Sequence, residues 1–258
     1  MGRVIAVTNQ KGGVGKTTTA VNLAASLGDI GKRVLLVDTD PQGNSTSGFG
    51  VNKKDLKKST YHLLVEGARA DEVRLTTPFK KVDILPAGIE LAAAEIELVD
   101  LSERVYRLRS SVLPIKESYD YILIDCPPSL GLITLNALTV SDTILIPIQC
   151  EYYALEGLSQ LMATVRQVKR LYNARIDIEG VLLTMYDGRL NLTLQVVDEV
   201  KKFFPKKVFK TVIPRNVRLS EAPGFGMPVL YYDRVSKGTV AYYELAQEIL
   251  KNHPDTLK

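Results

Sequence analysis

The amino-acid sequence predicts an α/β fold with a doubly wound, mostly parallel sheet and helices on both faces. Short β-branched runs alternate with helical patterns along the whole chain, as expected of βαβ units. Most of these runs lack strict alternation of apolar and polar residues, which is typical of parallel strands covered on both faces. Because no low-complexity linker or internal repeat divides the chain, we expect one domain over residues 1–258.

The expected elements follow one another in a regular order. Strands are predicted at residues 3–8, 33–37, 82–85, 121–124, 143–147, 180–184 and 208–213. Helices are predicted at residues 16–27, 90–97, 102–115, 130–138, 155–171, 190–204 and 238–250. The stretch 41–58 is rich in Gly, Ser, Asn and Lys and is predicted to be a mobile loop.

Composition narrows the class of protein. Apolar residues make up 45% and charged residues 24%, which are ordinary values for a globular chain. We find no apolar run long enough to span a bilayer and no signal peptide, and we expect Cys126 and Cys150 to be buried, reduced thiols. Residues 1–159 carry 17 Lys+Arg against 19 Asp+Glu, and residues 160–258 carry 16 against 10. The basic C-terminal part is compatible with a polyanionic partner.

A glycine-rich segment between the first strand and the first helix predicts a phosphate-binding loop. Its residues are Lys11, Gly12, Gly13, Val14, Gly15, Lys16, Thr17 and Thr18. The glycines let backbone N–H groups point at phosphate oxygens, and the helix adds its positive N-terminal end. Lys16 is placed for the β- and γ-phosphates, Thr17 for Mg²⁺ and Thr18 for the α-phosphate. The generic pattern has a glycine where Gln10 stands, and this variant adds Lys11, so we expect ATP and Mg²⁺ at a modified loop.

Three carboxylates follow apolar strands, where a doubly wound sheet places its ligand crevice. Asp38 and Asp40 follow the second strand, and Asp125 follows the run 121–124. An aspartate after a strand is often a turn former or a helix cap. Beside a phosphate loop, however, Asp125 fits an acid that holds Mg²⁺ through water.

The segment Lys11–Thr18 resembles the deviant Walker A motif of the ParA/MinD ATPases. Further stretches resemble the chromosomal, Soj-type branch of ParA, and the match covers nearly the whole chain. They are residues 125–131 (DCPPSLG), 149–157 (QCEYYALEG) and 213–223 (IPRNVRLSEAP). The resemblance implies a homodimer in which Lys11 reaches the nucleotide of the second subunit, with Lys11, Lys16 and Asp40 as catalytic residues.

The resemblance also implies roles for other residues. Asp40 would position the attacking water, Asp38 would support the metal through water, and Pro214 and Asn216 would lie beside the adenine. The dimer would bind double-stranded DNA without sequence preference, with Arg189 and Arg218 as the favoured contacts. Further basic candidates are Lys201, Lys202, Lys206, Lys207, Arg215, Arg234 and Lys237.

The family further implies a setting and partners in the cell. A ParB-like centromere-binding protein would stimulate the slow hydrolysis of ATP. The protein would be cytoplasmic and associated with the nucleoid. It would have a possible second role in regulating the initiation of replication. Because the phosphate loop begins at Lys11, we expect no N-terminal helix-turn-helix domain.

Two other functions remain open from the sequence. A membrane-associated ATPase for division-site placement, like MinD, needs a basic amphipathic C-terminal helix, and Pro254 interrupts that region. An iron–sulfur protein like the nitrogenase iron protein needs cysteines from both subunits, whereas we expect Cys126 to pack behind the metal site.

Overall fold

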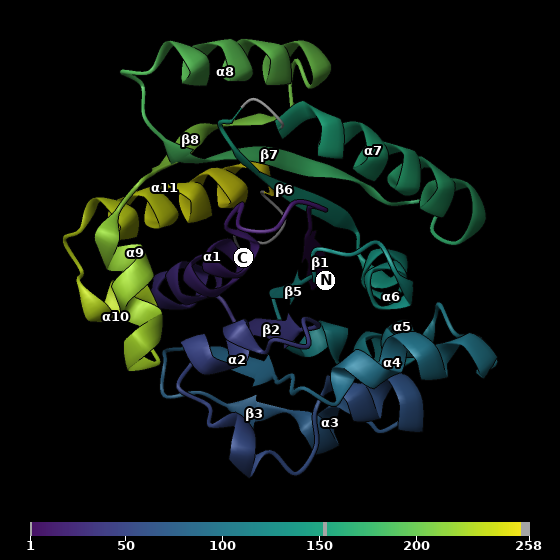
Figure 1. Cartoon of the computed structure of the whole chain (residues 1–258). Coiled ribbons are helices and arrows are strands. Elements are labelled where there is room, and N and C mark those ends of the chain that lie inside the picture. The colour runs from purple at the N-terminus through teal and green to yellow at the C-terminus, as the bar shows by residue number, and fades with distance from the viewer. Residues whose placement is uncertain (1, 152–153, 254–258) are drawn as a thin grey trace.

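The fold is built on one eight-stranded sheet (Figure 1). The computed structural model describes residues 2–151 and 154–253. In chain order the strands are β1 (Arg3–Val7), β2 (Val34–Asp38), β3 (Leu75–Thr76), β4 (Val82–Leu85), β5 (Tyr121–Asp125), β6 (Thr143–Gln149), β7 (Asp177–Tyr186) and β8 (Val208–Pro214). The spatial order is β3-β4-β2-β5-β1-β6-β7-β8, and only β3 runs antiparallel to its neighbour. The predicted α/β class with a mostly parallel sheet is confirmed.

Helices connect the strands and cover both faces of the sheet. In chain order they are α1 (Lys16–Ile30), α2 (Asn44–Gly48), α3 (Ala70–Val73), α4 (Leu91–Glu97), α5 (Arg107–Val112), α6 (Leu132–Val140), α7 (Ala154–Leu171), α8 (Asn191–Phe203), α9 (Val217–Glu221), α10 (Val229–Tyr232) and α11 (Lys237–Asn252). Short 3-10 helices lie at Lys53–Asp55, Leu98–Asp100, Leu113–Ser118 and Ala222–Phe225, and a π-helical turn at His62–Glu66.

Alternate residues of the central strands enter two separate cores. In β1, Val4 and Ala6 pack with residues of α4 to α8, whereas Ile5 and Val7 pack with residues of α1 and α11. Side chains of successive strand residues point to opposite faces, so a strand buried on both faces must be apolar throughout. This requirement explains the continuous apolar runs from which the strands were predicted.

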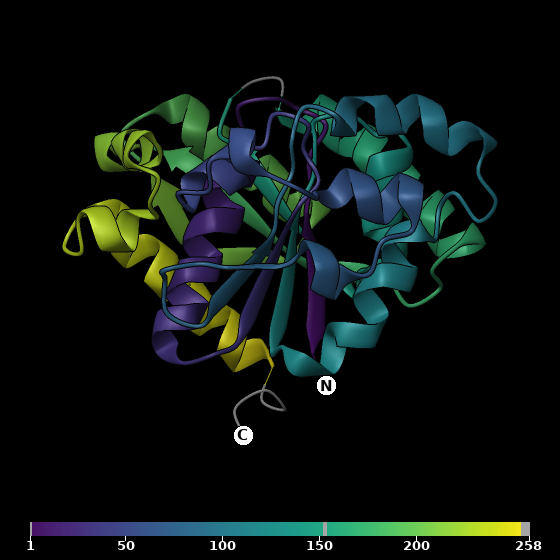
Figure 2. The ribbon, with the colours of Figure 1, turned by 90° about the horizontal axis from the view of Figure 1, so that it is seen from below.

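The sheet brings the ends of its central strands together. Asp125 pairs in register with Val7 on one side and with Asp38 on the other. The glycine-rich loop after β1 therefore shares one edge of the sheet with both aspartates. Figure 2 shows this loop, in purple, at the edge of the molecule opposite the N label. A crevice outside the carboxyl ends of the strands is where this kind of fold binds ligands.

Several segments differ from the sequence prediction, and three of them show the physical reason directly. Within 41–58, the mobile-loop prediction is wrong for residues 44–48, which form α2 with Ser45 and Thr46 fully buried. The helix predicted over 102–115 begins only at Arg107, because Glu103 has φ of 53° and cannot continue a right-handed helix. Strand β3 was not predicted, because it has two exposed residues and no apolar run.

The described residues bear on the membrane alternative only in part. In residues 2–151 and 154–253, no helix combines the length and the hydropathy that a bilayer span requires. Helix α11 ends at Asn252, and Pro254, on which the amphipathic-helix argument rests, lies outside the described residues.

Candidate nucleotide site

The loop between β1 and α1 has the backbone shape that a phosphate cradle needs. Gly13 and Gly15 have φ of 76° and 87°, a left-handed region that favours glycine. The loop is held from both sides, since Asn9 donates to Pro147 O at 2.8 Å and the Thr184 hydroxyl donates to Val14 O at 2.8 Å. Helix α1 begins at Lys16, so its N-terminal N–H groups face the cradle.

The two lysines of the loop lie in different environments. Lys16 is 7% exposed, and its Nζ donates to the Lys11 carbonyl oxygen at 3.1 Å. Burial lowers the pKa of Lys16, and the nearby carboxylates of Asp125 and Asp40 oppose that shift. The Lys11 side chain is 32% exposed, and its Nζ lies 3.0 Å from Glu151 Oε2. Lys16 is thus a buried cation inside the loop, whereas Lys11 stands at the surface beside it.

Two buried carboxyls lie together at the ends of β2 and β5. Burial raises the pKa of Asp125 to about 8 and that of Asp38 to about 6, and in each case a neighbouring aspartate contributes. Asp125 Oδ2 accepts a hydrogen bond from Ser45 at 2.7 Å, and Thr17 lies close enough to lower the pKa of the same carboxyl. Two acids that share a buried site are costly to ionise without a cation.

Asp38 fixes the segment that carries Asp40. Asp38 Oδ1 accepts from the Asp40 N–H at 3.1 Å, and Oδ2 accepts from the N–H and the hydroxyl of Thr46 at 2.8 and 2.7 Å. Asp40 is largely buried, and its Oδ1 accepts from the Gln42 N–H at 2.9 Å. The carboxylate of Asp40 is therefore held in a short turn directly after β2.

A divalent cation suits this set of groups. Among the described residues, Asp125 Oδ1 is buried and has no hydrogen-bond partner, which is unusual for a carboxylate oxygen. The same residues contain no cluster of three or more His, Cys, Asp or Glu side chains placed to hold a metal. The ligands of a cation here would be a few protein groups, water molecules and phosphate oxygens. Mg²⁺ is usually bound in this way.

The Asp125→Asn substitution should stabilise the ligand-free protein at alkaline pH. The folded-state pKa of about 8 lies above the ordinary value of 3.8. The free energy of unfolding is therefore expected to fall as the pH rises from about 4 through about 8, where this buried carboxyl must ionise. The introduced amide would still accept from Ser45 but could not ionise. Thermal melts should show the variant melting a few degrees above the parent at pH 8, with the gap narrowing as the pH is lowered to 5. A gap independent of pH would contradict the assignment.

Other predicted site residues lie further along the chain. Pro214 ends β8, and Asn216 caps α9 because its Oδ1 accepts from the Arg218 N–H at 2.9 Å. The structure thus gives Asn216 a capping role, and its contact with adenine stays a prediction. Cys126 is buried directly after Asp125, and burial raises the pKa of its thiol.

The two favoured DNA contacts are both paired with carboxylates. Arg189 is 89% exposed and forms two hydrogen bonds with Asp187 at 2.8 and 2.6 Å, which lower the pKa of Asp187 to about 2. Arg218 lies 2.7 Å from Glu221 and 3.1 Å from Asp233. A DNA phosphate would have to compete with these acids.

The structure adds four residues that the sequence did not single out. Asn9 and Thr184 shape the loop, while Ser45 and Thr46 hold the carboxylates of Asp125 and Asp38. A polar residue at the end of a strand or the start of a helix was the only available signal, and it is common at turns.

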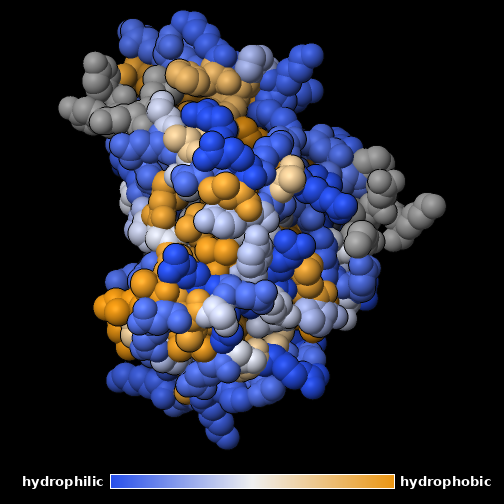
Figure 3. Space-filling model, turned by 90° about the vertical axis from the view of Figure 1, so that its right-hand side faces the viewer, coloured by the Kyte–Doolittle hydropathy of each residue, from blue (hydrophilic) through white to orange (hydrophobic). Residues whose placement is uncertain are grey.

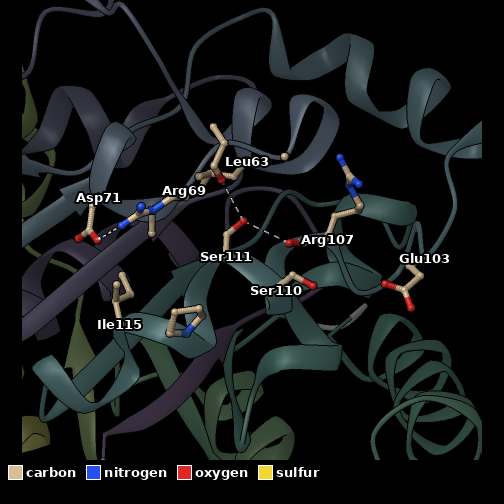
Figure 4. Close-up of a pocket in the computed structure, with 12 residues that line it drawn as sticks. Leu63, Arg69, Asp71, Glu103, Arg107, Ser110, Ser111 and Ile115 are labelled. Atoms are coloured by element: carbon tan, nitrogen blue, oxygen red, sulfur yellow. Dashed lines mark hydrogen bonds and ion pairs between the residues drawn. The ribbon is translucent and has the colours of Figure 1, made fainter.

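A pocket of about 580 Å³ lies away from this loop, between α3 and α5 (Figure 4). Its arginines are engaged within the fold. Arg107 donates to Leu64 O and Val65 O at 2.8 Å, and Arg69 lies 3.6 Å from Asp71. Figure 4 shows Ser111 directed at backbone carbonyl oxygens of the pocket wall. We assign the chemistry to the loop rather than to this pocket.

The fold and the loop define a class of protein: an α/β nucleotide-binding protein with a P-loop between β1 and α1. A family model described as an AAA domain matches residues 2–178. The chain is 59% identical to the sporulation initiation inhibitor protein Soj of Bacillus subtilis over 252 residues, which is 98% of this chain and 100% of that protein. It is 51% identical to the chromosome partitioning protein ParA of Myxococcus xanthus over 97% of this chain and 89% of that protein.

A solved structure supports the same placement. The cobyrinic acid a,c-diamide synthase of Mycobacterium smegmatis with bound ADP and magnesium superposes with a TM-score of 0.86 at 36% identity, covering 98% of this chain and 95% of that one. The chain belongs to the ParA/MinD family of P-loop ATPases, in its Soj-type branch of chromosome-partitioning proteins.

Proposed function

We propose that residues 1–258 form one P-loop ATPase domain that binds ATP with Mg²⁺ and acts as a dimerising switch in chromosome or plasmid partitioning. The observation that carries the proposal is the contrast between the two lysines of the loop. Lys16 is buried within its own cradle, whereas Lys11 lies at the surface. A surface cation at the mouth of the site can offset phosphate charge on the nucleotide of a second subunit, as an arginine finger does.

Different residues of this chain would bind the phosphates, the adenine, the metal ion and the attacking water. Lys16, the loop N–H groups and Thr18 would bind the phosphates, and Pro214 and Asn216 would lie beside the adenine. Thr17 would ligate Mg²⁺ directly, with Asp125 and Asp38 acting through water. When bound, Mg²⁺ offsets charge on the phosphate oxygens. Asp40, held in its turn by Gln42, would orient the attacking water.

Dimerisation would follow from where the nucleotide lies. If ATP forms part of the contact between two subunits, ATP binding favours the dimer and hydrolysis releases it. The dimer would bind duplex DNA on the bacterial nucleoid, in the cytoplasm. A ParB-like protein would stimulate the slow hydrolysis, and the same switch could regulate replication initiation.

The Gly12→Val variant should still bind ATP but should stay monomeric. A Cβ at Gly12 would meet no atom of the described residues within 4 Å, and its φ is not positive, so a single subunit can accept the side chain. A second subunit approaching the loop could not. Size-exclusion chromatography with ATP, with ADP and without nucleotide, each repeated with DNA, should show a dimer for the parent with ATP and a monomer for the variant.

Gly224→Val is the matched control, because a Cβ there also meets no described atom within 4 Å. It should dimerise like the parent. A Gly12→Val protein that dimerises normally would show that the loop is not at a subunit contact. A parent protein that stays monomeric with ATP and DNA would overturn the switch itself.

Arg189→Ala should weaken ATP-dependent binding to unrelated DNA duplexes and reduce its dependence on salt. Each phosphate contact contributes about −0.9 to the slope of log K against log salt. A dimer of the variant loses one contact in each subunit, so its slope should be less steep by about two contacts. Salt titrations of the parent and the variant measure this slope. Arg69→Ala is the control, since Arg69 is also exposed and lies beside an aspartate two residues away. Binding that ignores salt, or that needs one sequence, would contradict the DNA proposal.

A further inference from the structure

Helix α4 is apolar on both its buried and its exposed side. Leu91, Ala94 and Leu98 are buried in the core. On the outer side, Ile89 is 74% exposed, Ile96 is 77% exposed and Val99 is 49% exposed. Backbone hydrogen bonds from Leu91 to Gly88 and from Ala92 to Ile89 extend the helical turns on the N-terminal side, and the 3-10 turn Leu98–Asp100 extends them on the other.

The exposed apolar residues form one stripe rather than isolated positions. At 100° per residue, Ile89, Ala92, Ile96 and Val99 fall within about a quarter of the helix circumference. One exposed isoleucine is ordinary on a protein surface, but a helix that is apolar on two sides usually has a second partner. Apolar side chains gather at the left edge of the lower half of Figure 3, where α4 lies (compare Figure 1).

The stripe is bordered mainly by acidic residues, and one exposed cation, Arg104, donates to Val99 O at 2.7 Å at its C-terminal end. Residues 82–103 contain six Asp+Glu and no Lys, Arg or His, although the chain as a whole has 33 Lys+Arg. The exposed acids beside the stripe are Glu90, Glu97, Asp100 and Glu103. Two of them contact neutral groups rather than cations, because Ser59 donates to Glu90 and Tyr61 donates to Glu97. We call these acids and the four stripe residues the acidic–apolar face.

Helix α4 is also connected to the nucleotide edge of the sheet. Glu95 accepts from the N–H groups of Leu132 and Ile133 at 2.8 and 3.2 Å, and so caps the start of α6. The contact is close, since a Cβ at Gly131 would lie 2.4 Å from Glu95 Oε2. Residues 126–131 connect Asp125 to helix α6. Helix α4 therefore contacts the C-terminal end of this connection, whose N-terminal end is at the aspartate.

We infer that the acidic–apolar face is the docking surface for a basic amphipathic segment of a protein partner. Such a segment would bury the apolar stripe with its own apolar side and pair its cations with the surrounding carboxylates. Charge complementarity selects this occupant, because a nucleic acid would be repelled. This inference does not depend on ATP binding. A segment docked on α4 would lie on the helix whose Glu95 contacts the start of α6.

The test uses the full chain without nucleotide and a short fluorescent helical peptide made of Leu and Lys at amphipathic spacing. The matched peptide has Glu in place of every Lys. Fluorescence anisotropy should show binding of the Lys peptide only. The Ile96→Lys variant should weaken that binding by at least about tenfold, since it replaces the centre of the stripe with a like charge. Ile96→Leu should bind as the parent does.

Leu171→Lys is the control, because Leu171 is an exposed apolar residue at the end of α7. Equal peptide binding by Ile96→Lys and Leu171→Lys would overturn the inference. So would an Ile96→Lys protein that loses an ATP-dependent dimer seen in the parent, because the face would then contact a second copy. The melting temperature of Ile96→Lys should still rise with Mg²⁺–ATP, as that of the parent does, which would show that the nucleotide site is intact. The docking proposal and the nucleotide proposal are therefore tested independently.

Discussion

The Asp40→Ala protein should bind ATP and form the ATP-dependent dimer, but it should hydrolyse ATP about 10²- to 10⁴-fold more slowly than the parent. Asp40 lies after β2 beside Asp38, is largely buried and is near enough to Lys16 to influence the pKa of that lysine. Its carboxylate is held by the Gln42 N–H, so it can orient water without reorganising. Single-turnover hydrolysis, with nucleotide affinity measured separately, distinguishes the chemical step from binding.

A second substitution separates the charge of Asp40 from its structural role. Asp40→Asn keeps an oxygen that accepts from Gln42 and removes only the negative charge. It should be as slow as Asp40→Ala. Asp55→Ala, which removes an exposed carboxylate from the following 3-10 helix, should hydrolyse at the parent rate. Parent-level hydrolysis by Asp40→Asn would show that the charge is not needed. Loss of ATP binding in either variant would assign Asp40 to the binding step.

The sequence predicts the central sheet well because burial on both faces leaves a strong local signal. The runs of β1, β2 and β5 are apolar at nearly every position, since both cores need them. The signal weakens at the sheet margins. Strand β7 begins at Asp177, before the predicted 180, because its first residues are held by pairing with β6 rather than by apolar character. Helices α9 and α10 are too short to show a helical period.

The candidate site was predictable only in part for a similar reason. The glycine-rich loop and the aspartates after β2 and β5 are local patterns. The groups that position those aspartates are not, because Ser45 and Asp125 are 80 residues apart and meet only through the sheet. The same holds for the contact between Lys11 and Glu151 across 140 residues. Burial of Ser45 and Thr46 also explains why a segment with a loop-like composition is a helix. Their hydroxyls satisfy carboxylates rather than water.

Replacing Lys16 with alanine should weaken ATP binding at least about 100-fold, which corresponds to about 2.7 kcal/mol. The ammonium of Lys16 is buried, donates to the Lys11 carbonyl oxygen and has its pKa lowered by burial. A buried cation has already lost its hydration when the protein folds. The binding of a phosphate therefore stabilises a buried cation more than it stabilises an exposed one. Isothermal titration with Mg²⁺–ATP measures the loss.

Lys11→Ala is the most informative comparison, since it removes the same charge from the same loop. Lys11 is at the surface and contacts Glu151, so its loss should leave the affinity of a single subunit for ATP nearly unchanged while hydrolysis falls. Lys57→Ala, an exposed lysine in the segment after α2, controls for net charge. If Lys16→Ala and Lys11→Ala weakened ATP binding equally, the division between a cradle lysine and a lysine for the second subunit would be wrong. If neither weakened it, the loop would not be a phosphate site.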